Sequence, residues 1–563
     1  MDFIILLMFL CVASVSAQNS DEVSAISALL SVDPEDLSEE EMEKYSGLLK
    51  HRVMLNVASE KELSSTGLFT KFQIASLLDY RLRSGPCMSY MELASLDGFG
   101  ADYVDRVTPF ISLTTRPDVG GRTFHEVTAR ASLRADAERL RYGYSTRYKL
   151  KVGNRMNASF ACTRSLDADS PLPDALCGSI EGRFKKLPLT FVVGDLNARF
   201  GQGLVMWTGS DFNSLNAPSA FMKRAFGVTP SASYSGNNVP TGFSSELALR
   251  RMTVTAFVTA PGIKSITETP EKLKLAPGIN LTWVFRNGQV GMTHYQEFAD
   301  MKSNLCIPVM RTSADVSMCI GGVDVFSEFM YDWVEQRLSG TAGVITPVGQ
   351  YLTMAARLKY ADLEYSMAVA AAIKKRKLNC SLSSELVMYS ESKAKNQDRS
   401  IQLKMNALCQ LNCFDFLELK FRMTERVRSW GHRFRTDARL DLTCPLSQFV
   451  LTGRVNMLNC DGTSFLTYIE GGYKTGGWAV YLRQGLFVVD DWDDRIYVYE
   501  RDAPGCYNVP AFYGRGLWTS FMCSYKLSHL CRLYFRAGYT TYPLMTEKKP
   551  GKAELRFQSV FDF

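Results

Sequence analysis

The sequence predicts a small all-α domain followed by a large antiparallel transmembrane β-barrel of about 18–22 strands. Apolar residues recur at helical spacing from Glu22 to Ile111, whereas short alternating segments separated by turn residues fill the chain after Arg122. The chain has 563 residues, of which 46% are apolar, so it is long and apolar enough to exclude a disordered tail. The expected strand number assumes roughly 20–24 residues for each strand and its connection.

Residues 1–17 have the pattern of an export signal, with an apolar run over Phe3–Ala13 and small residues at Val15-Ser16-Ala17. Beyond them, the most apolar stretch is Met367–Ile373, which is far shorter than the ~20 residues of a spanning helix. We therefore expect an exported chain without a membrane helix. Its expected regions are a signal peptide (1–17), an acidic helical segment (18–49), a paired helical domain (50–116) and a barrel (122–563).

Charge divides the chain into two parts. Residues 18–116 hold 16 Asp and Glu against 9 Lys and Arg, a net charge of −7. Asp2 is the only charge before them and the whole chain carries +6, so residues 117–563 carry +14. A basic barrel favours a polyanionic cargo, whereas the acidic stretch Asp21–Glu43 opposes one.

Two short units repeat within the helical part. Ser59-Glu-Lys-Glu62 and Ser89-Tyr-Met-Glu92 both fit the capping box, in which Ser and Glu satisfy each other's backbone amides. A glycine-bearing turn and a second helix follow each box, and Gly85-Pro86 separates the units. The pattern predicts an internal duplication of helix-hairpin-helix type.

The run Leu55–Leu63 and the hairpin Asp97–Gly100 resemble the paired helix-hairpin-helix domain of competence DNA receptors. In that family a Gly-hydrophobic-Gly hairpin presents backbone amides to a DNA phosphate, and a helix N-terminus with glycine is a suitable anion site. The resemblance implies DNA contacts by Gly67, Leu68, Lys71, Gly98, Phe99 and Gly100. The alternative is a helical module that docks a periplasmic protein or only packs.

The barrel prediction rests on alternation, which the last strand shows best. Ala553, Leu555, Phe557 and Phe561 fall on one face, and Glu554, Arg556, Gln558 and Asp562 fall on the other. Asn287-Gly288 and Gly476-Gly477 are hairpin signals between such runs. A lipid-facing apolar row with a charged lumen suits a transmembrane barrel, and the final Phe563 resembles the terminal targeting signal of outer-membrane barrels.

The layout also resembles an outer-membrane family that joins an N-terminal helix-hairpin-helix domain to a large barrel. The segments that carry this resemblance are Gly194-Asp195, Phe200-Gly-Gln-Gly-Leu204, Arg495–Glu500 and Phe512–Gly516. The resemblance implies an architecture, with the barrel in the outer membrane of a Gram-negative cell and the helical domain in the periplasm.

The sequence names no catalytic set, metal site or cofactor site. The five histidines are widely spaced, and no two form a HxxxH or HExxH ligand pair. Asp490–Asp494 lacks the spacing of a calcium loop, Gly201-Gln-Gly203 resembles turn glycines, and Lys374–Lys377 fits a charged rim. The closest cysteine pairs, Cys409/Cys413 and Cys523/Cys531, match no CxxC motif, so we expect small apolar residues facing lipid or core.

We therefore expect a non-enzymatic outer-membrane barrel in contact with membrane lipid. The leading function is binding or translocation of DNA or another polymer. The alternative is a membrane scaffold whose helical domain docks a periplasmic protein.

Overall fold

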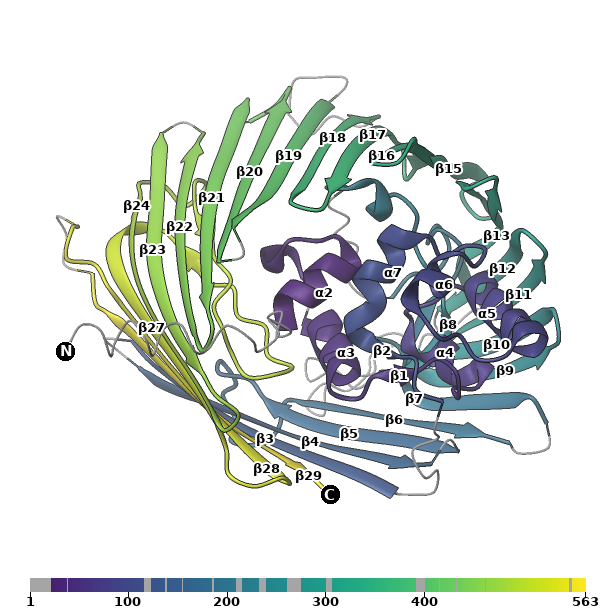
Figure 1. Ribbon diagram of the computed structural model, residues 1–563, viewed down its shortest axis with the longest axis horizontal. Coiled ribbons are helices and arrows are strands. Elements are labelled where there is room, and N and C mark those ends of the chain that lie inside the picture. Colours follow the sequence, from purple (N-terminus) through teal and green to yellow (C-terminus); the bar gives the residue numbers. More distant parts are fainter. Residues whose placement is uncertain are drawn as a thin grey trace.

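The computed structural model places a helical domain inside a large closed β-barrel (Figure 1). The structure describes residues 22–37, 39–115, 123–136, 139–153, 155–184, 187–208, 215–231, 239–260, 275–299, 306–390, 400–414, 416–431, 433–460, 462–545 and 549–563. The predicted signal peptide, and residues 117–121 between the predicted helical domain and the predicted barrel, lie outside these residues.

Within the described residues, 24 antiparallel strands form the barrel, which closes where β29 pairs with β3. The first strands are β3 (Thr123–Ala135), β4 (Leu140–Val152), β5 (Met156–Arg164), β6 (Ala175–Arg183), β7 (Leu189–Arg199), β9 (Thr241–Leu249), β10 (Met252–Ala260), β11 (Ala276–Phe285), β12 (Gly288–Ala299), β13 (Cys306–Ile320), β14 (Val323–Asp332) and β15 (Arg337–Val348). The others are β16 (Leu352–Ala361), β17 (Glu364–Lys375), β18 (Leu378–Tyr389), β19 (Ser400–Phe414), β20 (Leu417–Arg428), β21 (Phe434–Leu446), β22 (Phe449–Asn459), β23 (Thr463–Lys474), β24 (Trp478–Val489), β27 (Gly514–Lys526), β28 (Cys531–Thr541) and β29 (Lys552–Asp562).

The barrel fold was predicted, and the strand number is higher than the expected 18–22. Strand and connection together take fewer residues than assumed, because many connections are very short. The turns Arg250–Arg251, Gly321–Gly322 and Ser447–Gln448 each have two residues. The hairpin predicted at Asn287-Gly288 forms one residue earlier, since Phe285 pairs with Gly288.

The predicted alternation of apolar and polar residues determines which side chains face outwards and which face the lumen. On β29, Leu555 and Phe557 are exposed on the outer face, whereas Gln558 is buried on the lumenal face. The same outer band runs around the barrel, with Leu382 and Ile469 62% and 63% exposed. An apolar outer band over a polar lumen is the pattern of a transmembrane barrel.

Among the described residues, no helix combines the length and the apolar character needed to cross a membrane.

The two barrel ends differ in their connections. At the end where Phe563 lies, here called the terminal mouth, connections between strands have two to five residues. At the opposite end, here called the loop mouth, most connections are longer, among them residues 200–240 and 490–513, although β16 and β17 are joined there by two residues. The two ends of the barrel can therefore be distinguished by the lengths of their connections.

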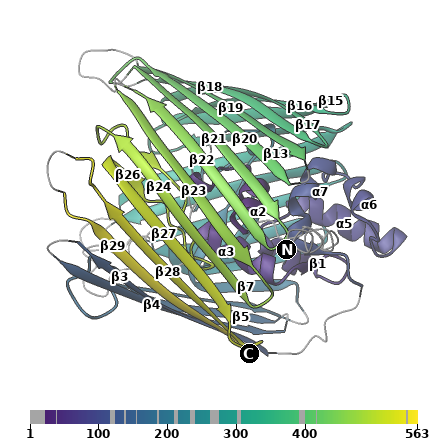
Figure 2. The ribbon, with the colours of Figure 1, turned by 60° about the vertical axis from the view of Figure 1, so that its left-hand side comes forward.

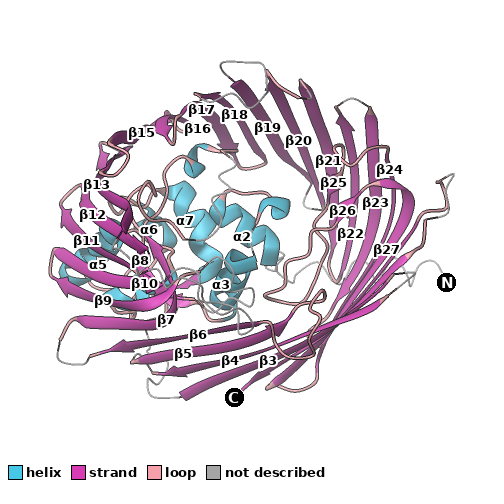
Figure 3. Ribbon diagram, turned by 180° about the vertical axis from the view of Figure 1, so that it is seen from behind, coloured by secondary structure: helices cyan, strands magenta, loops and turns pink. Residues whose placement is uncertain are grey.

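The helical domain, residues 22–113, lies inside the ring of strands (Figures 1 and 3). Figure 2 shows α5 and α6 projecting at the terminal mouth, whereas α2 and α3 lie within the barrel. Its elements are α2 (Glu22–Leu30), η1 (Pro34–Asp36), α3 (Glu39–Lys50), β1 (Val53–Met54), α4 (Glu60–Thr66), α5 (Lys71–Ser84), α6 (Tyr90–Ala94), α7 (Ala101–Val107), η2 (Thr108–Phe110) and β2 (Ile111–Ser112).

Two segments fold from the loop mouth into the lumen. The first inserted segment, described over residues 200–208, 215–231 and 239–240, contains η3 (Pro218–Ala220) and β8 (Gly227–Pro230), and β8 pairs with the end of β7. The second inserted segment, residues 490–513, contains β25 (Ile496–Tyr497) and β26 (Ala511–Phe512), which pair with each other. Both inserted segments therefore meet the helical domain within the barrel.

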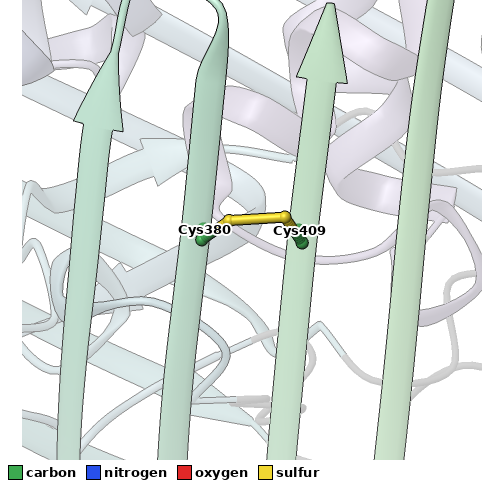
Figure 4. The surroundings of a disulfide bond; sticks show 2 residues. All are labelled: Cys380 and Cys409. Atoms are coloured by element: carbon green, nitrogen blue, oxygen red, sulfur yellow. A yellow bond between two sulfur atoms is a disulfide. The ribbon is translucent and has the colours of Figure 1, made fainter.

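Cysteine pairing differs from the expectation of unpaired small residues. Cys380 on β18 and Cys409 on β19 are opposite each other in the ladder and form a disulfide (Figure 4). Their neighbours in the same row, Ile373 and Phe421, are exposed on the outer face. The disulfide thus lies on the outer, lipid-facing side of the wall, while Cys523 and Cys531 are free.

Candidate functional site

The helical domain has a core of its own. Buried residues from Val23 to Ile111 form one apolar cluster, so the predicted acidic segment and the paired hairpins share a single core. Both predicted capping boxes are present: Ser59 with Glu62 begins α4, and Ser89 with Glu92 begins α6. The domain is therefore a compact unit before any contact with the barrel is counted.

Glu35 of η1 joins the helical domain to the barrel wall. Its carboxylate lies 2.9 Å from Arg439 Nη1 on β21 and 2.7 Å from Arg454 Nη1 on β22. Asp441 accepts from the Nε atoms of both arginines, at 2.6 and 2.5 Å. Burial alone would raise the pKa of Glu35, but Arg439 and Arg454 outweigh burial and hold that pKa well below its ordinary value.

Two further buried carboxylates repeat this arrangement. Asp33 pairs with Arg422 Nη1 at 3.0 Å and with Lys420 Nζ at 3.6 Å, both on β20. Burial raises the pKa of Asp33, but these two cations lower it below its ordinary value. On α3, Glu43 pairs closely with Arg147 of β4. Acidic residues of the helical domain thus meet basic residues of the lumen on two sides.

The basic run Lys374–Lys377 lies at the terminal mouth, in agreement with the predicted charged rim. Lys374, one residue before the end of β17, pairs with Asp102 at 3.1 Å and with Asp105 at 3.0 Å, both on α7. Burial raises the pKa of Asp102, but Arg106 and Lys374 lower it below its ordinary value. The helical domain is therefore held at the rim as well as inside the lumen.

The glycine motif at Phe200–Leu204 ties the first inserted segment to the wall. Glu328 on β14 is buried, and its Oε2 accepts hydrogen bonds from the amides of Gln202 at 2.7 Å and Leu204 at 3.1 Å. Gly201 has φ 55°, and a Cβ at this position would lie 2.8 Å from the Glu328 carboxyl carbon. The predicted turn glycines thus form a cradle for a carboxylate.

Gly194-Asp195 marks where the first inserted segment leaves the barrel wall. Pairing of β7 with β9 ends at Asp195, and pairing with β8 begins at Leu196. Asp195 is buried and accepts from the amide of Gly178 at 2.8 Å and from the hydroxyl of Thr241 at 2.6 Å. Gly194 has φ 102°, and a Cβ there would overlap the backbone of Gly178.

Besides the exposed pair of Asp490 with Arg515, three ion pairs fasten the second inserted segment. Glu500 pairs with Arg536, Asp502 with Arg556, and Arg501 with Glu470, so each partner comes from a barrel strand. The same segment contacts the helical domain: the Tyr507 hydroxyl donates to the Pro34 carbonyl at 2.9 Å, and the Tyr499 amide to Glu35 Oε1 at 3.3 Å. The helical domain therefore rests on this segment next to its own wall contacts.

The structure places the first predicted DNA-binding hairpin against the barrel. Gly67 caps α4 with φ 66°, and a Cβ there would meet Lys44 and the ring of Phe226. Leu68 is buried in the domain core. Lys71 Nζ lies 4.0 Å from the Glu246 carboxylate on β9. With the domain in the lumen, this hairpin faces protein.

The second hairpin is only partly open. Gly98 has φ 84°, its carbonyl accepts from Gln73 Nε2 at 2.7 Å, and a Cβ there would lie 2.8 Å from the ring of Phe72. Phe99 is buried and packs against Phe69. Gly100 caps α7, is exposed, and has open space around its Cβ position. Of the three predicted glycines, Gly100 is thus the one with free space where a Cβ would lie.

Sequence reasoning missed the lumenal contacts that define this site. Glu35 and Arg454 are 419 positions apart, and a single sequence does not indicate such a pairing. One signal was present, because the helical region carries −7 and the remainder +14. Opposite net charges attract, so these values predict that the acidic helical domain lies against the basic wall of the barrel.

Among the described residues, no group of three or more His, Cys, Asp and Glu side chains is placed to hold a metal ion. In the predicted acidic turn Asp490–Asp494, Asp490 pairs with Arg515 at 2.8 Å.

No family model and no curated protein matches the chain. Among solved structures, similar folds include the P pilus usher translocation pore PapC, with a TM-score of 0.37, 9% identity, and coverage of 78% of this chain and 99% of that chain. The siderophore receptor PirA from Pseudomonas aeruginosa has a TM-score of 0.41, 7% identity, and coverage of 80% and 82%. The ferric citrate transporter FecA in the unliganded form has a TM-score of 0.35, 10% identity, and coverage of 78% of each chain.

Proposed function

We propose that this protein is an outer-membrane channel that its own helical domain keeps closed until the domain moves. The observation that carries this proposal is the position of residues 22–113 inside the barrel, with Glu35 held between Arg439 and Arg454. The two inserted segments occupy the lumen from the other side. Cargo passes when the helical domain shifts, and the barrel itself supplies the path.

The nature of the interface supports movement of the helical domain as a unit. The buried residues of the apolar cluster all come from Val23 to Ile111, with Tyr499 and Tyr507 of the second inserted segment packed against them at the edge. The domain meets the barrel strands mainly through ion pairs and hydrogen bonds. One such contact joins the hydroxyls of Ser31 and Ser219 at 2.6 Å. Polar interfaces exchange protein partners for water at low net cost, whereas an apolar core resists opening.

We place the terminal mouth in the periplasm. Outer-membrane barrels have short periplasmic turns and longer extracellular loops, and the terminal mouth has the short turns here. In this orientation the helical domain enters from the periplasm, and the inserted segments enter from outside.

Conductance of the full chain in planar bilayers tests the proposal. The parent should pass little current. The variant Asp33→Asn with Glu35→Gln should open frequently, because Arg422 loses the Asp33 carboxylate, and Arg439 and Arg454 are left to share Asp441 alone. Conversely, Ser31→Cys with Ser219→Cys should allow a disulfide that locks the helical domain to the first inserted segment. The locked protein should stay closed until a reductant is added, and Ser31→Cys alone is the control.

A parent protein that conducts steadily at a level unaffected by the lock would contradict the proposal. So would an Asp33→Asn, Glu35→Gln variant that assembles normally, by heat-modifiable migration, yet conducts like the parent.

DNA remains the named candidate cargo. The charge of +14 beyond residue 117 supports a polyanion, and Lys71 and Gly100 belong to the hairpins that resemble DNA-binding ones. Because Lys71 meets Glu246 while the domain is in the lumen, duplex DNA should bind only after release. Fluorescence anisotropy with labelled duplex should therefore detect salt-sensitive binding to the Asp33→Asn, Glu35→Gln protein and none to the locked protein. Equal DNA binding by the two proteins would argue against DNA binding through the hairpins.

A scaffold role is the second candidate, and one observation favours it. At the projecting tip of the domain, Leu82 at the end of α5 and Met88 and Met91 around α6 are 87%, 72% and 86% exposed. Exposed large apolar side chains of this kind are typical of protein-binding surfaces. Under this proposal, Leu82→Asp with Met91→Asp should abolish co-purification of a periplasmic protein while leaving bilayer conductance unchanged.

A further inference from the structure

We infer that the lumenal wall from β16 to β21 selects for anionic solutes whose charged group is a phosphate or a carboxylate. This inference rests on the proposed channel function and names the charge of its substrate. It stands on two adjoining features: a cationic row near the loop mouth, and a cavity with a cationic lining deeper in the lumen.

The cationic row consists of Lys404 on β19, Arg426 on β20 and Arg435 on β21. These residues are direct register partners, since Lys404 pairs with Arg426 and Arg426 with Arg435. Met405, next along β19, is exposed on the outer face, so Lys404 points to the lumen. The Arg435 guanidinium donates to the carbonyl of Asp493 in the second inserted segment, at 2.7 Å, which also places this row inside the barrel.

Three like charges in one row repel each other unless something negative joins them. The Nε of Arg426 is buried and has no hydrogen-bond partner among the described residues. Across the described part of the chain, no carboxylate forms an ion pair with Lys404 or Arg426. On the other side of the row, Lys404 has Glu385 as its register partner, and Glu385 pairs with Arg357 at 3.5 Å.

Glu385 also lines the cavity, so this residue connects the cationic row with the cavity. The cavity has a volume of about 170 Å³ and lies between the first inserted segment and the wall. Its polar lining includes Gln202, Lys223, Thr341, Arg357, Lys359 and Glu385. At roughly 30 Å³ per water molecule, it has room for several waters or for one small oxyanion.

Positive charge exceeds negative charge along this wall. The cavity and the row contribute Lys223, Arg357, Lys359, Lys404, Arg426 and Arg435. The carboxylates that face them are Asp36 of η1 near Lys404, Glu385, Glu328 near Lys223, and Asp437, two residues along β21 from Arg435. Guanidinium groups bind carboxylate and phosphate through paired hydrogen bonds, and an excess of cations in a confined lumen raises the local concentration of anions.

Ion selectivity of the opened full chain tests the inference. In the Asp33→Asn, Glu35→Gln background, the permeability to chloride should exceed that to potassium by about fivefold or more. Adding Lys404→Gln and Arg426→Gln should bring the ratio towards one. Arg376→Gln with Lys377→Gln is the matched control, since it removes two exposed cations from the turn at the terminal mouth. The control should keep the selectivity.

Binding to the closed parent provides a measurement that does not need conduction. Calorimetry with pyrophosphate and, separately, with citrate should show binding to the parent that weakens about tenfold or more in Lys404→Gln, Arg426→Gln. The stronger of the two probes identifies phosphate or carboxylate as the preferred group. A double variant that binds both probes as the parent does, or an opened channel without anion preference, overturns the inference. A parent that binds while the opened variant does not conduct sinks the channel proposal alone.

Discussion

Glu35 Oε1 lies 2.7 Å from Arg454 Nη1, which joins the start of the helical domain to the middle of the barrel wall across 419 positions of sequence. Both side chains are buried, and Arg439 and Asp441 complete the group. A buried ion pair adds little net stability over an apolar pair, but removal of one partner leaves an uncompensated charge.

Glu35→Ala should therefore weaken docking of the helical domain by about 3–5 kcal/mol, the cost of breaking a buried pair. Hydrogen exchange should show faster exchange across residues 39–50, with the barrel strands unchanged. Asp79→Asn is the control, because the pair of Asp79 with Arg83 is exposed on the surface and such pairs contribute under about 1 kcal/mol. Equal effects of the two substitutions would contradict a special role for Glu35.

Acid should release the helical domain only at low pH. The docked pKa values of Asp33 and Glu35 lie below their ordinary values of 3.8 and 4.5, so ionisation of both carboxyls stabilises docking. That stabilisation is fully present above pH 4.5 and is lost as the pH falls through the docked pKa values. Conductance should stay low from pH 7 to 5 and rise below about pH 4. Opening that begins near pH 6 would point to another group.

Glu328→Ala should free the first inserted segment, because the amides of Gln202 and Leu204 would lose their acceptor. A lost hydrogen bond to a buried charged group costs about 1.5–3 kcal/mol. Protease cleavage within residues 200–226 should accelerate, and Glu328→Gln, which keeps an acceptor oxygen, should show a smaller effect. Glu335→Ala, at an exposed pair with Arg337, should leave cleavage unchanged.

Deletion of Phe563 should impair barrel assembly. The Phe563 backbone exchanges two hydrogen bonds with His125 at 2.8 and 2.9 Å, and the two rings stack with centroids 5.2 Å apart. These contacts extend the seam between β29 and β3, on which closure depends. The deletion should reduce heat-modifiable, membrane-inserted protein, whereas Phe563→Trp should retain it. Normal assembly of the deletion variant would contradict the predicted role of Phe563 as a targeting signal.

The strand faces could be predicted from the sequence, because alternation fixes them locally. Arg536 and Tyr534 face the lumen and Phe535 faces outwards, as the alternation of polar and apolar residues along β28 requires. Lumenal contacts could not be predicted in the same way, because the partners of Glu35 depend on how the barrel closes. Phe200–Leu204 shows the same limit: its glycines indicate a turn, but the carboxylate that they enclose belongs to a strand over 120 positions later.

The contact of Tyr499 and Tyr507 with η1 has a consequence for the direction of communication. Because the second inserted segment comes from the loop mouth and hydrogen-bonds to Pro34 and Glu35, a molecule that displaces this segment from outside also removes two supports of the helical domain. Under the proposed channel function, arrival of a solute at the loop mouth would therefore be coupled to the helical domain, which projects at the terminal mouth. Glu35 would connect the two, because it contacts both the second inserted segment and the barrel wall.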